Sequence, residues 1–272
     1  MIKNRFKLIV GLVEETLTKN DFDPDEIREW YQFHLAKERM AGKKFSIAEY
    51  IQALIYSQLS AQRVWTKLEE KLPKIDEIFQ QYKLSYVKKM SKDPLKIVES
   101  LENIKAGSRP LEKQMKVLSY NLIILEKIHT KIEKDYTIKS DMKVKLEKAE
   151  KYIEMISEYG SEYNLNQIGE ALAGEFLKNI GIPAVKPDVH ILRILGKERL
   201  GILSTAYNTS LKKAITEFHA NVLSISNDIT DVVYYDSLFW IFGASKKAEI
   251  CTKTPNCHKC LLTKVCNYGT LI

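Results

Sequence analysis

Four cysteines near the C-terminal end constrain this chain more than any other feature of its sequence. They are Cys251, Cys257, Cys260 and Cys266, with the spacing C-x5-C-x2-C-x5-C. Close spacing lets one loop wrap four thiolates around a single centre, and thiolates are soft ligands that select zinc or iron–sulfur clusters. A zinc ribbon usually has two CxxC pairs, whereas this loop has one CxxC between two wider gaps. We therefore expect a [4Fe–4S] cluster in loop 251–266, with zinc as the alternative.

Length and composition are those of an ordinary globular chain. The 272 residues can bury one or two cores, and the hydrophobic share of 45% argues against disorder over most of the length. No apolar run approaches the roughly 20 residues of a membrane helix. Glu14 and Glu15 directly follow the apolar part of the N-terminal segment, which argues against a signal peptide. We expect a cytoplasmic protein that does not bind membranes, associated with the nucleoid if its source is bacterial.

The chain has a modest basic excess, with 42 Lys and Arg against 35 Asp and Glu and a net charge of +7. This excess suits a partner with phosphates, because each neutralised phosphate releases counterions. Much of the positive charge lies in two lysine-rich stretches, 131–151 and 246–264. We interpret the first stretch as a solvated helix face. Charge alone therefore permits nucleic-acid binding without establishing it.

Hydrophobic spacing predicts helices along most of the chain. Apolar residues recur at intervals of three and four in the segments 48–68, 93–103, 110–131 and 143–159. Glycine and proline are scarce, at 11 and 7 residues, and no long segment requires a strand. The N-terminal segment is compatible with either a strand or a helix. The sequence predicts an all-α fold.

The cysteine loop resembles that of the helix-hairpin-helix DNA glycosylases related to endonuclease III, which have C-x6-C-x2-C-x5-C. A second resemblance is the run LNQIGEALA from Leu165 to Ala173, followed by PDVHILR from Pro187 to Arg193. Family members have L-P-G-(V/I)-G-x-x-x-A and then V-D-x-H-(I/V)-x-R. Here Asn166 and Gln167 replace the proline and the first glycine, and the first cysteine gap is one residue shorter.

In this family the hairpin binds a DNA phosphate. Glycine lets the backbone approach the phosphate, and the N–H groups that begin the next helix point at it. The resemblance implies DNA contacts at the following positions: Gln167, Ile168, Gly169, Glu170, Ala171 and, near the mouth of the base pocket, Lys186.

Asp188 is the candidate catalytic residue. Breaking an N-glycosidic bond develops positive charge on the sugar, and a carboxylate beside C1′ stabilises that charge and orients water. The alternative is that Asp188 caps a helix beginning at Val189, and the two roles are compatible. We expect His190 to be structural and Arg193 to lie on a helix surface or in an ion pair.

The hairpin lacks the lysine with which related lyases form a Schiff base. By alignment that position is Ala171, or Glu170 if the gap is shifted, and neither side chain can form an imine. The sequence therefore predicts a monofunctional glycosylase that uses water. Lys186 is the amine that would contradict this prediction if it trapped DNA covalently.

A third resemblance covers residues 50–62, where relatives have a helix ending in L-S-x-Q. It implies that Gln62 fills the gap left by a flipped base and that Trp65 lines the base pocket. Solvent exposure of Gln62 and core packing of Trp65 are the alternatives. The stretch Ile55–Gln58 lacks the carboxylate of adenine glycosylases. Alkylated purines are therefore our favoured substrate, with uracil and deaminated or oxidised bases left open.

The resemblance implies an all-α fold with two lobes and a DNA cleft between them. Residues 46–183 would form one lobe, and residues 1–45 together with 184–272 would form the other. The expected partner is double-stranded DNA with a damaged base, bound by a monomer. Two alternatives are a non-catalytic protein that binds damaged or structured DNA on the same scaffold, and a zinc-stabilised helical regulator.

Overall fold

The computed structural model describes residues 2–136, 139–204 and 211–271. Over these ranges the backbone forms α-helices and short 3-10 helices without any β-strand, so the predicted all-α class is confirmed. The N-terminal segment is a helix. The α-helices are α1 (Ile2–Lys19), α2 (Tyr31–Met40), α3 (Ile47–Leu59), α4 (Trp65–Glu69), α5 (Leu72–Ile78), α6 (Leu84–Met90), α7 (Pro94–Asn103), α8 (Leu111–Lys116), α9 (Leu118–Asp135), α10 (Met142–Ser157), α11 (Glu170–Asn179), α12 (Val189–Leu195), α13 (Leu211–Ile225) and α14 (Asp231–Gly243).

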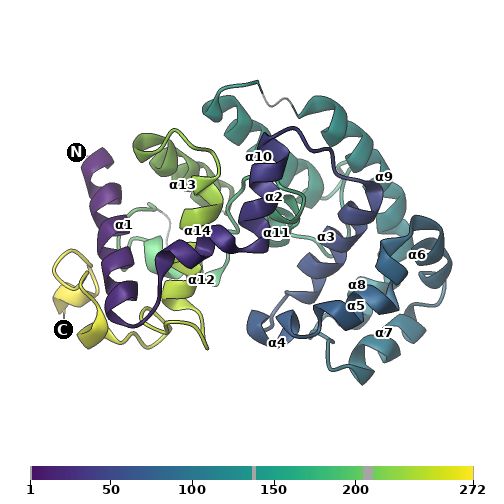
Figure 1. The fold of residues 1–272 in the computed structure, drawn as a ribbon, viewed down its shortest axis with the longest axis horizontal. Helices are drawn as coiled ribbons and strands as arrows, with labels where there is room; N and C mark the ends of the chain where they lie inside the picture. Colours follow the sequence, from purple (N-terminus) through teal and green to yellow (C-terminus); the bar gives the residue numbers. More distant parts are fainter. Residues whose placement is uncertain (1, 137–138, 205–210, 272) are drawn as a thin grey trace.

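The helices form two groups that lie side by side (Figure 1). The first group contains α3 to α9, and the second contains α1, α12, α13, α14 and the C-terminal loop. Helix α1 packs on α13 and α14, so the N-terminal segment joins the C-terminal part of the chain. Helices α2, α10 and α11 lie between the groups, and α11 packs on α3, α10 and α2.

Capping residues explain where several helices begin. Ser46 and Glu49 form a capping box at the start of α3, in which each side chain bonds the other residue's backbone N–H. Asp141 caps α10 through its Oδ1 and the N–H of Val144 at 2.8 Å. Asp93 caps α7, whose first residue is Pro94. These side chains satisfy N–H groups that have no partner within their helix.

Two predicted helical segments are interrupted. The segment 48–68 forms α3 and α4 with a turn between them, and the segment 110–131 divides into α8 and α9 at Val117. The second break has a packing reason, because it lets α8 lie on α7 while α9 runs along α3. A single apolar stripe along residues 111–125 could not reveal this change of direction.

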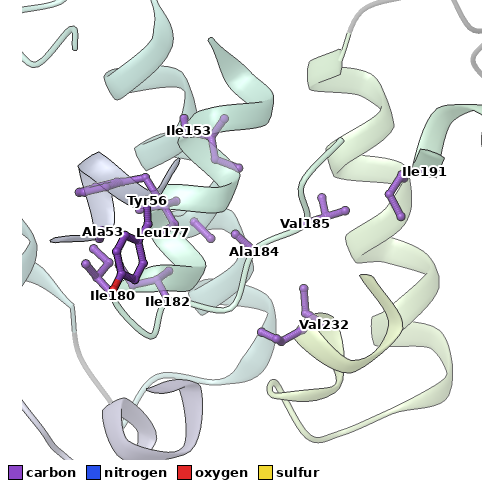
Figure 2. Close-up of a cluster of buried hydrophobic side chains, with 14 of the residues drawn as sticks. Ala53, Tyr56, Ile153, Leu177, Ile180, Ile182, Ala184, Val185, Ile191 and Val232 are labelled. Atoms are coloured by element: carbon purple, nitrogen blue, oxygen red, sulfur yellow. The ribbon is translucent and has the colours of Figure 1, made fainter. Parts of the chain in front are cut away.

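The core runs through both groups of helices. Helix α3 is buried over its whole second half, and α14 is buried from Val232 to Phe239, which fits helices surrounded by other elements. Figure 2 shows how the segment after α11 joins the groups: Ile182 lies near Tyr56, whereas Val185 lies near Ile191 and Val232. No helix in the described ranges combines the length and apolarity that a membrane span requires.

Candidate functional site

The segment from Gly181 to Asp188 connects α11 to α12 and passes between the two groups of helices. Gly181 has a φ of +73°, and a side chain there would collide with the carbonyl of Leu35, so this turn requires glycine. The residues from Ile182 to Val185 are buried. We call residues 181–188 the connecting segment. Its packing on both sides fixes the position of Asp188 at its end.

Asp188 caps α12, which is the alternative role that the sequence offered for it. Its Oδ1 accepts hydrogen bonds from the backbone N–H groups of His190 at 2.8 Å and Ile191 at 3.2 Å. Both bonds use the same oxygen, and among the described residues Oδ2 has no hydrogen-bond partner. The side chain is half-buried. The carboxylate is therefore held in place with one oxygen still available.

Two contacts clamp the connecting segment just before Asp188. A Cβ added at Gly174 of α11 would collide with the carbonyl of Val185, so the helix and the segment are in direct backbone contact. On the other side, the backbone N–H of Lys186 donates to Oδ1 of Asp236 in α14 at 3.1 Å. The segment that holds Asp188 is thus attached to α11 and to α14.

A buried charge cluster lies behind this clamp, formed by Glu175, Lys178, Lys186 and Asp236. Nζ of Lys178 is 2.5 Å from Asp236 Oδ2 and 3.2 Å from Glu175 Oε2. The carboxylates of Asp236 and Glu175 outweigh burial and raise the pKa of Lys178. Burial would raise the pKa of Glu175, but the ammonium groups of Lys178 and Lys186 lower it to about 2. Burial raises the pKa of Asp236, although Lys178 opposes this shift. Glu175 and Lys178 are therefore charged at neutral pH.

Lys186 connects this charge cluster to the end of α3. Its Nζ lies 3.6 Å from Glu175 Oε2 and 3.5 Å from Ser60 Oγ, and its side chain is 20% exposed. Ser60 directly follows α3 and lies two residues before Gln62. The structure therefore brings the end of α3 next to Lys186, two residues before Asp188.

The turn before α11 contains a left-handed residue at the position where family members have the first glycine. Gln167 adopts a φ of +64°, the left-handed conformation that the missing glycine would adopt most easily. Asn121 of α9 fixes this turn, because its side chain accepts from the N–H of Asn166 at 2.8 Å and donates to that residue's carbonyl at 2.9 Å. Gln167 itself is exposed. The hydrogen bonds with Asn121 thus help to hold a turn that glycine would otherwise favour by its own backbone preference.

The start of α11 presents backbone rather than side chains. Gly169 is exposed and provides no side-chain cap, while Ile168 is 3% exposed and belongs to the core. Any contact by Ile168 would therefore use its backbone. Glu170 and Ala171 are half-buried, and burial raises the pKa of Glu170, although Lys212 opposes this shift. No side chain in the turn offers an amine.

The turn between α3 and α4 holds the other two predicted contact residues. Gln62 is exposed and has a φ of +52°. Arg63 donates to the carbonyls of Gly107, at 2.7 Å, and Lys105, which ties the turn to the loop between α7 and α8. Trp65 begins α4, is half-buried and packs against the core. Both alternatives from the sequence, exposure of Gln62 and core packing of Trp65, describe these positions.

His190 and Arg193 lie on α12 beside a polar cleft of about 410 Å³ between that helix and the cysteine loop. The Nδ1 of His190 is 2.9 Å from NH2 of Arg193 and 3.2 Å from the carbonyl of Gly243. Burial, together with the charge of Arg193, lowers the pKa of His190, although Asp188 raises it. His190 is therefore neutral at pH 7, and the structural role expected for it stays a prediction.

All four cysteines line one cavity at the C-terminal end. Apolar side chains, among them Leu200, Phe242 and Leu262, form much of its wall. In the described ranges, no three His, Cys, Asp or Glu side chains converge closely enough to hold a single metal ion. The four thiols thus border one small cavity, with a water-accessible volume of about 20 Å³, rather than meeting at one point.

Arg199 provides a buried positive charge beside this cavity. It donates from NH1 to Sγ of Cys251 at 2.9 Å and to the carbonyl of the same residue at 3.1 Å. Burial raises the pKa of the Cys251 thiol, and Arg199 opposes this shift. Burial also raises the pKa of Cys260, to about 11. A soft cation in the cavity would favour the thiolates instead, since metal binding displaces the thiol protons.

Sequence reasoning missed the charge cluster, Asn121 and Arg199. Glu175 and Lys178 are three residues apart on an otherwise largely apolar part of α11, which is a weak sign of a buried ion pair. Their partner Asp236 lies 58 residues beyond Lys178. No local pattern connects residues at that separation.

Comparison of the chain with protein-family models, curated proteins and solved structures gives no match. The resemblance to the endonuclease III relatives therefore depends on the three motifs described above.

Proposed function

We propose that the chain is a DNA glycosylase with the two-lobed helix-hairpin-helix fold, and that it hydrolyses the N-glycosidic bond of a damaged base. Residues 46–183 would form one lobe, and residues 1–45 with 184–272 the other. The observation that carries this proposal is Asp188: a half-buried carboxylate with one oxygen available, held at the end of the connecting segment. A preorganised charge of this kind stabilises a developing cation.

In this proposal Asp188 acts on the sugar. Its Oδ1 remains bonded to the start of α12, which fixes the direction of Oδ2. As the C1′–N bond breaks, the base takes the electron pair, and the negative carboxylate stabilises the cationic sugar. A water then bonds to C1′ and passes its proton to Oδ2. Asp188 releases this proton to solvent, and a base that departs as an anion takes up a proton from solvent, whereas an alkylated purine departs neutral. The products are a free base and an abasic site.

Three elements would position double-stranded DNA. The exposed backbone at Gly169, Glu170 and Ala171 would bind a phosphate at the start of α11, where the helix dipole favours negative charge. Lys186 would add positive charge near the flipped nucleotide. Gln62, exposed at the turn after α3, would fill the space left by the base, and Trp65 would border it.

The surroundings of the two nearest amines support a monofunctional reaction. Lys178 is 4% exposed and paired with two carboxylates, which keeps its amine protonated and inaccessible. Nζ of Lys186 lies 3.6 Å from Oε2 of Glu175, so this amine is paired with a carboxylate. The protonated amine of Lys178 cannot attack C1′. We therefore propose that water, rather than a lysine, completes the reaction.

We propose that Cys251, Cys257, Cys260 and Cys266 hold a [4Fe–4S] cluster. The donor set fits this group, because four thiols line one cavity and Arg199 donates to one of the sulfurs. Such a cluster would add a compact structural centre that can also exchange an electron. Broad visible absorption with about four irons and four sulfides per chain would support it. A colourless protein with one zinc would favour the zinc-stabilised alternative.

A panel of duplexes, each with one lesion, tests the proposed activity. The panel includes alkylated purines, uracil, hypoxanthine and an oxidised base, and each reaction is analysed with and without hot alkali. We expect strand cleavage only after alkali, because hydrolysis leaves an intact backbone. Cleavage without alkali, with a borohydride-trapped adduct lost in Lys186→Gln, would overturn the monofunctional assignment.

The same panel separates the enzyme from its closest alternative. DNA binding with no base release from any lesion would favour the non-catalytic binder on this scaffold. Gel filtration of the protein with and without duplex would show whether it binds DNA as the proposed monomer.

A further inference from the structure

Gln58 is a fully buried polar side chain of α3 that the proposed mechanism does not use. It has no exposed surface, and both its amide oxygen and its amide nitrogen lack hydrogen-bond partners among the described residues. Each unmet buried polar group costs about 1–3 kcal/mol. A fold that retains such a side chain therefore has an unused hydrogen-bonding capacity at this point.

The neighbours of Gln58 are satisfied, so poor packing does not explain its unmet groups. Ser57 Oγ donates to Ala53 at 2.7 Å, and Ser60 Oγ donates to Ser57 at 2.8 Å. The backbone carbonyl of Gln58 itself accepts from Gln114 Nε2 at 3.0 Å. Among the described residues at this end of α3, the side-chain amide of Gln58 is the group that lacks partners.

A second unmet group lies across the turn. Oγ1 of Thr66, in the first turn of α4, is buried without a partner in the described ranges. Gln58 and Thr66 thus flank the turn that contains Gln62. Ser60, two residues beyond Gln58, lies 3.5 Å from the amine of Lys186, which places this end of α3 beside the connecting segment.

A carboxamide has a specific recognition chemistry. It presents one acceptor and one donor side by side, which matches the paired donor and acceptor on the edge of a nucleobase. The group is neutral, so it recognises hydrogen-bonding pattern rather than charge. We propose that Gln58 binds the edge of the flipped base and determines which bases the protein accepts. This inference rests on the proposed function.

The assignment narrows the substrate class. Bases with an adjacent N–H and carbonyl, such as hypoxanthine or uracil, would satisfy both amide atoms. A purine that lacks these groups would leave them unmet, and buried unmet groups are what produce strong discrimination. Because Gln58 has no exposed surface in the free protein, the base would have to displace the turn at residues 60–64 to reach it.

Binding measurements test this inference without requiring catalysis. Duplexes contain hypoxanthine, unsubstituted purine or a tetrahydrofuran abasic analogue, with a 2′-fluoro sugar at each base to prevent cleavage. The variant is Gln58→Met, which keeps the length of the side chain and removes its polar atoms. Gln52→Met on the same helix is the matched control. A second variant, Gln58→Leu, guards against a misfit of methionine, and denaturation measures the stability of each protein.

We expect the wild type to bind hypoxanthine more tightly than purine, and Gln58→Met to weaken hypoxanthine binding by about 10- to 100-fold. Binding to the abasic analogue should not change, because no base is present, and stability should be equal or higher. Unchanged discrimination in Gln58→Met, or lower stability in both Gln58 variants, would overturn the inference alone. Absence of any wild-type binding to DNA would overturn the proposed function as well.

Discussion

The two ends of the proposed site differ in how completely the fold satisfies their polar groups. Around Asp188, the carboxylate accepts two backbone hydrogen bonds and the connecting segment is attached to α11 and α14. Around the end of α3, the side-chain amide of Gln58 and the Oγ1 atom of Thr66 are buried without partners in the described part of the chain. A catalytic group benefits from being fixed in advance, whereas a recognition group must keep its bonds for the substrate. This difference fits the proposed catalytic role of Asp188 and the proposed role of Gln58 in recognising the base.

The largest effect should come from breaking the charge cluster behind Asp188. Lys178→Met would leave Asp236 buried without its closest counter-ion, and we expect a loss of about 3–5 kcal/mol in the free energy of unfolding. Chemical denaturation measures this loss. The double variant Lys178→Met with Asp236→Asn should recover most of it, because no unpaired charge remains and the amide oxygen can still accept from Lys186. Equal instability in both variants would show that the pairing is unimportant.

A smaller change tests the clamp itself. Gly174→Ala would force the connecting segment away from α11, since its Cβ would collide with the carbonyl of Val185. We expect a stability loss of about 1–3 kcal/mol from overpacking. Base release should fall by at least about 10-fold, because small displacements of a catalytic group are costly. Full activity in a stable Gly174→Ala protein would mean that the position of Asp188 does not depend on this contact.

A contact between α10 and α13, away from both ends of the proposed site, provides a control for general effects on stability. Glu150 of α10 accepts from His219 at 2.9 Å and Thr216 at 2.8 Å on α13, and these bonds outweigh burial and lower the pKa of Glu150. Glu150→Gln should cost about 1 kcal/mol at pH 7. The difference from the wild type should disappear as the pH falls below about 4.5 through the lowered pKa, because the wild-type carboxyl then becomes neutral. Base release at pH 7 should not change, which would separate general destabilisation from effects on the site.

The smallest effect should come from the hairpin turn. Gln167 has a φ of +64°, so Gln167→Gly would relieve backbone strain while increasing the entropy of the unfolded chain. We expect stability to change by no more than about 1 kcal/mol. Gln167→Val, which tolerates this conformation poorly, should lower it by about 1–2 kcal/mol. Equal stability of the two variants would contradict the left-handed turn.

Local patterns predicted much of the fold and of the site. The three- and four-residue spacing located α7 and α10 to within a few residues, and for α3 it located the start but not the end. The Pro-Asp sequence before α12 indicated its cap. The spacing of the cysteines predicted that they would share one site, and they line one cavity. Each of these features depends on residues close together in the sequence.

Long-range contacts determined what the sequence could not show. The division between α8 and α9 follows from which helices they pack against, and the stripe of apolar residues is the same with or without it. Lys178 and Asp236 are paired only because α11 and α14 meet beside the connecting segment. In the sequence, Gln58 stood out only because the stretch Ile55–Gln58 contains no carboxylate. Its lack of hydrogen-bond partners could be recognised only once the positions of all its neighbours were known.

The most direct test of the account is Asp188→Asn under single-turnover conditions on the preferred lesion. Asparagine caps helices as well as aspartate does, so the start of α12 and the stability should be retained. We expect the rate of base release to fall by at least 10²-fold, through loss of the negative charge, while binding to the abasic analogue is unchanged. A folded Asp188→Asn protein that releases the base at the wild-type rate would contradict the account.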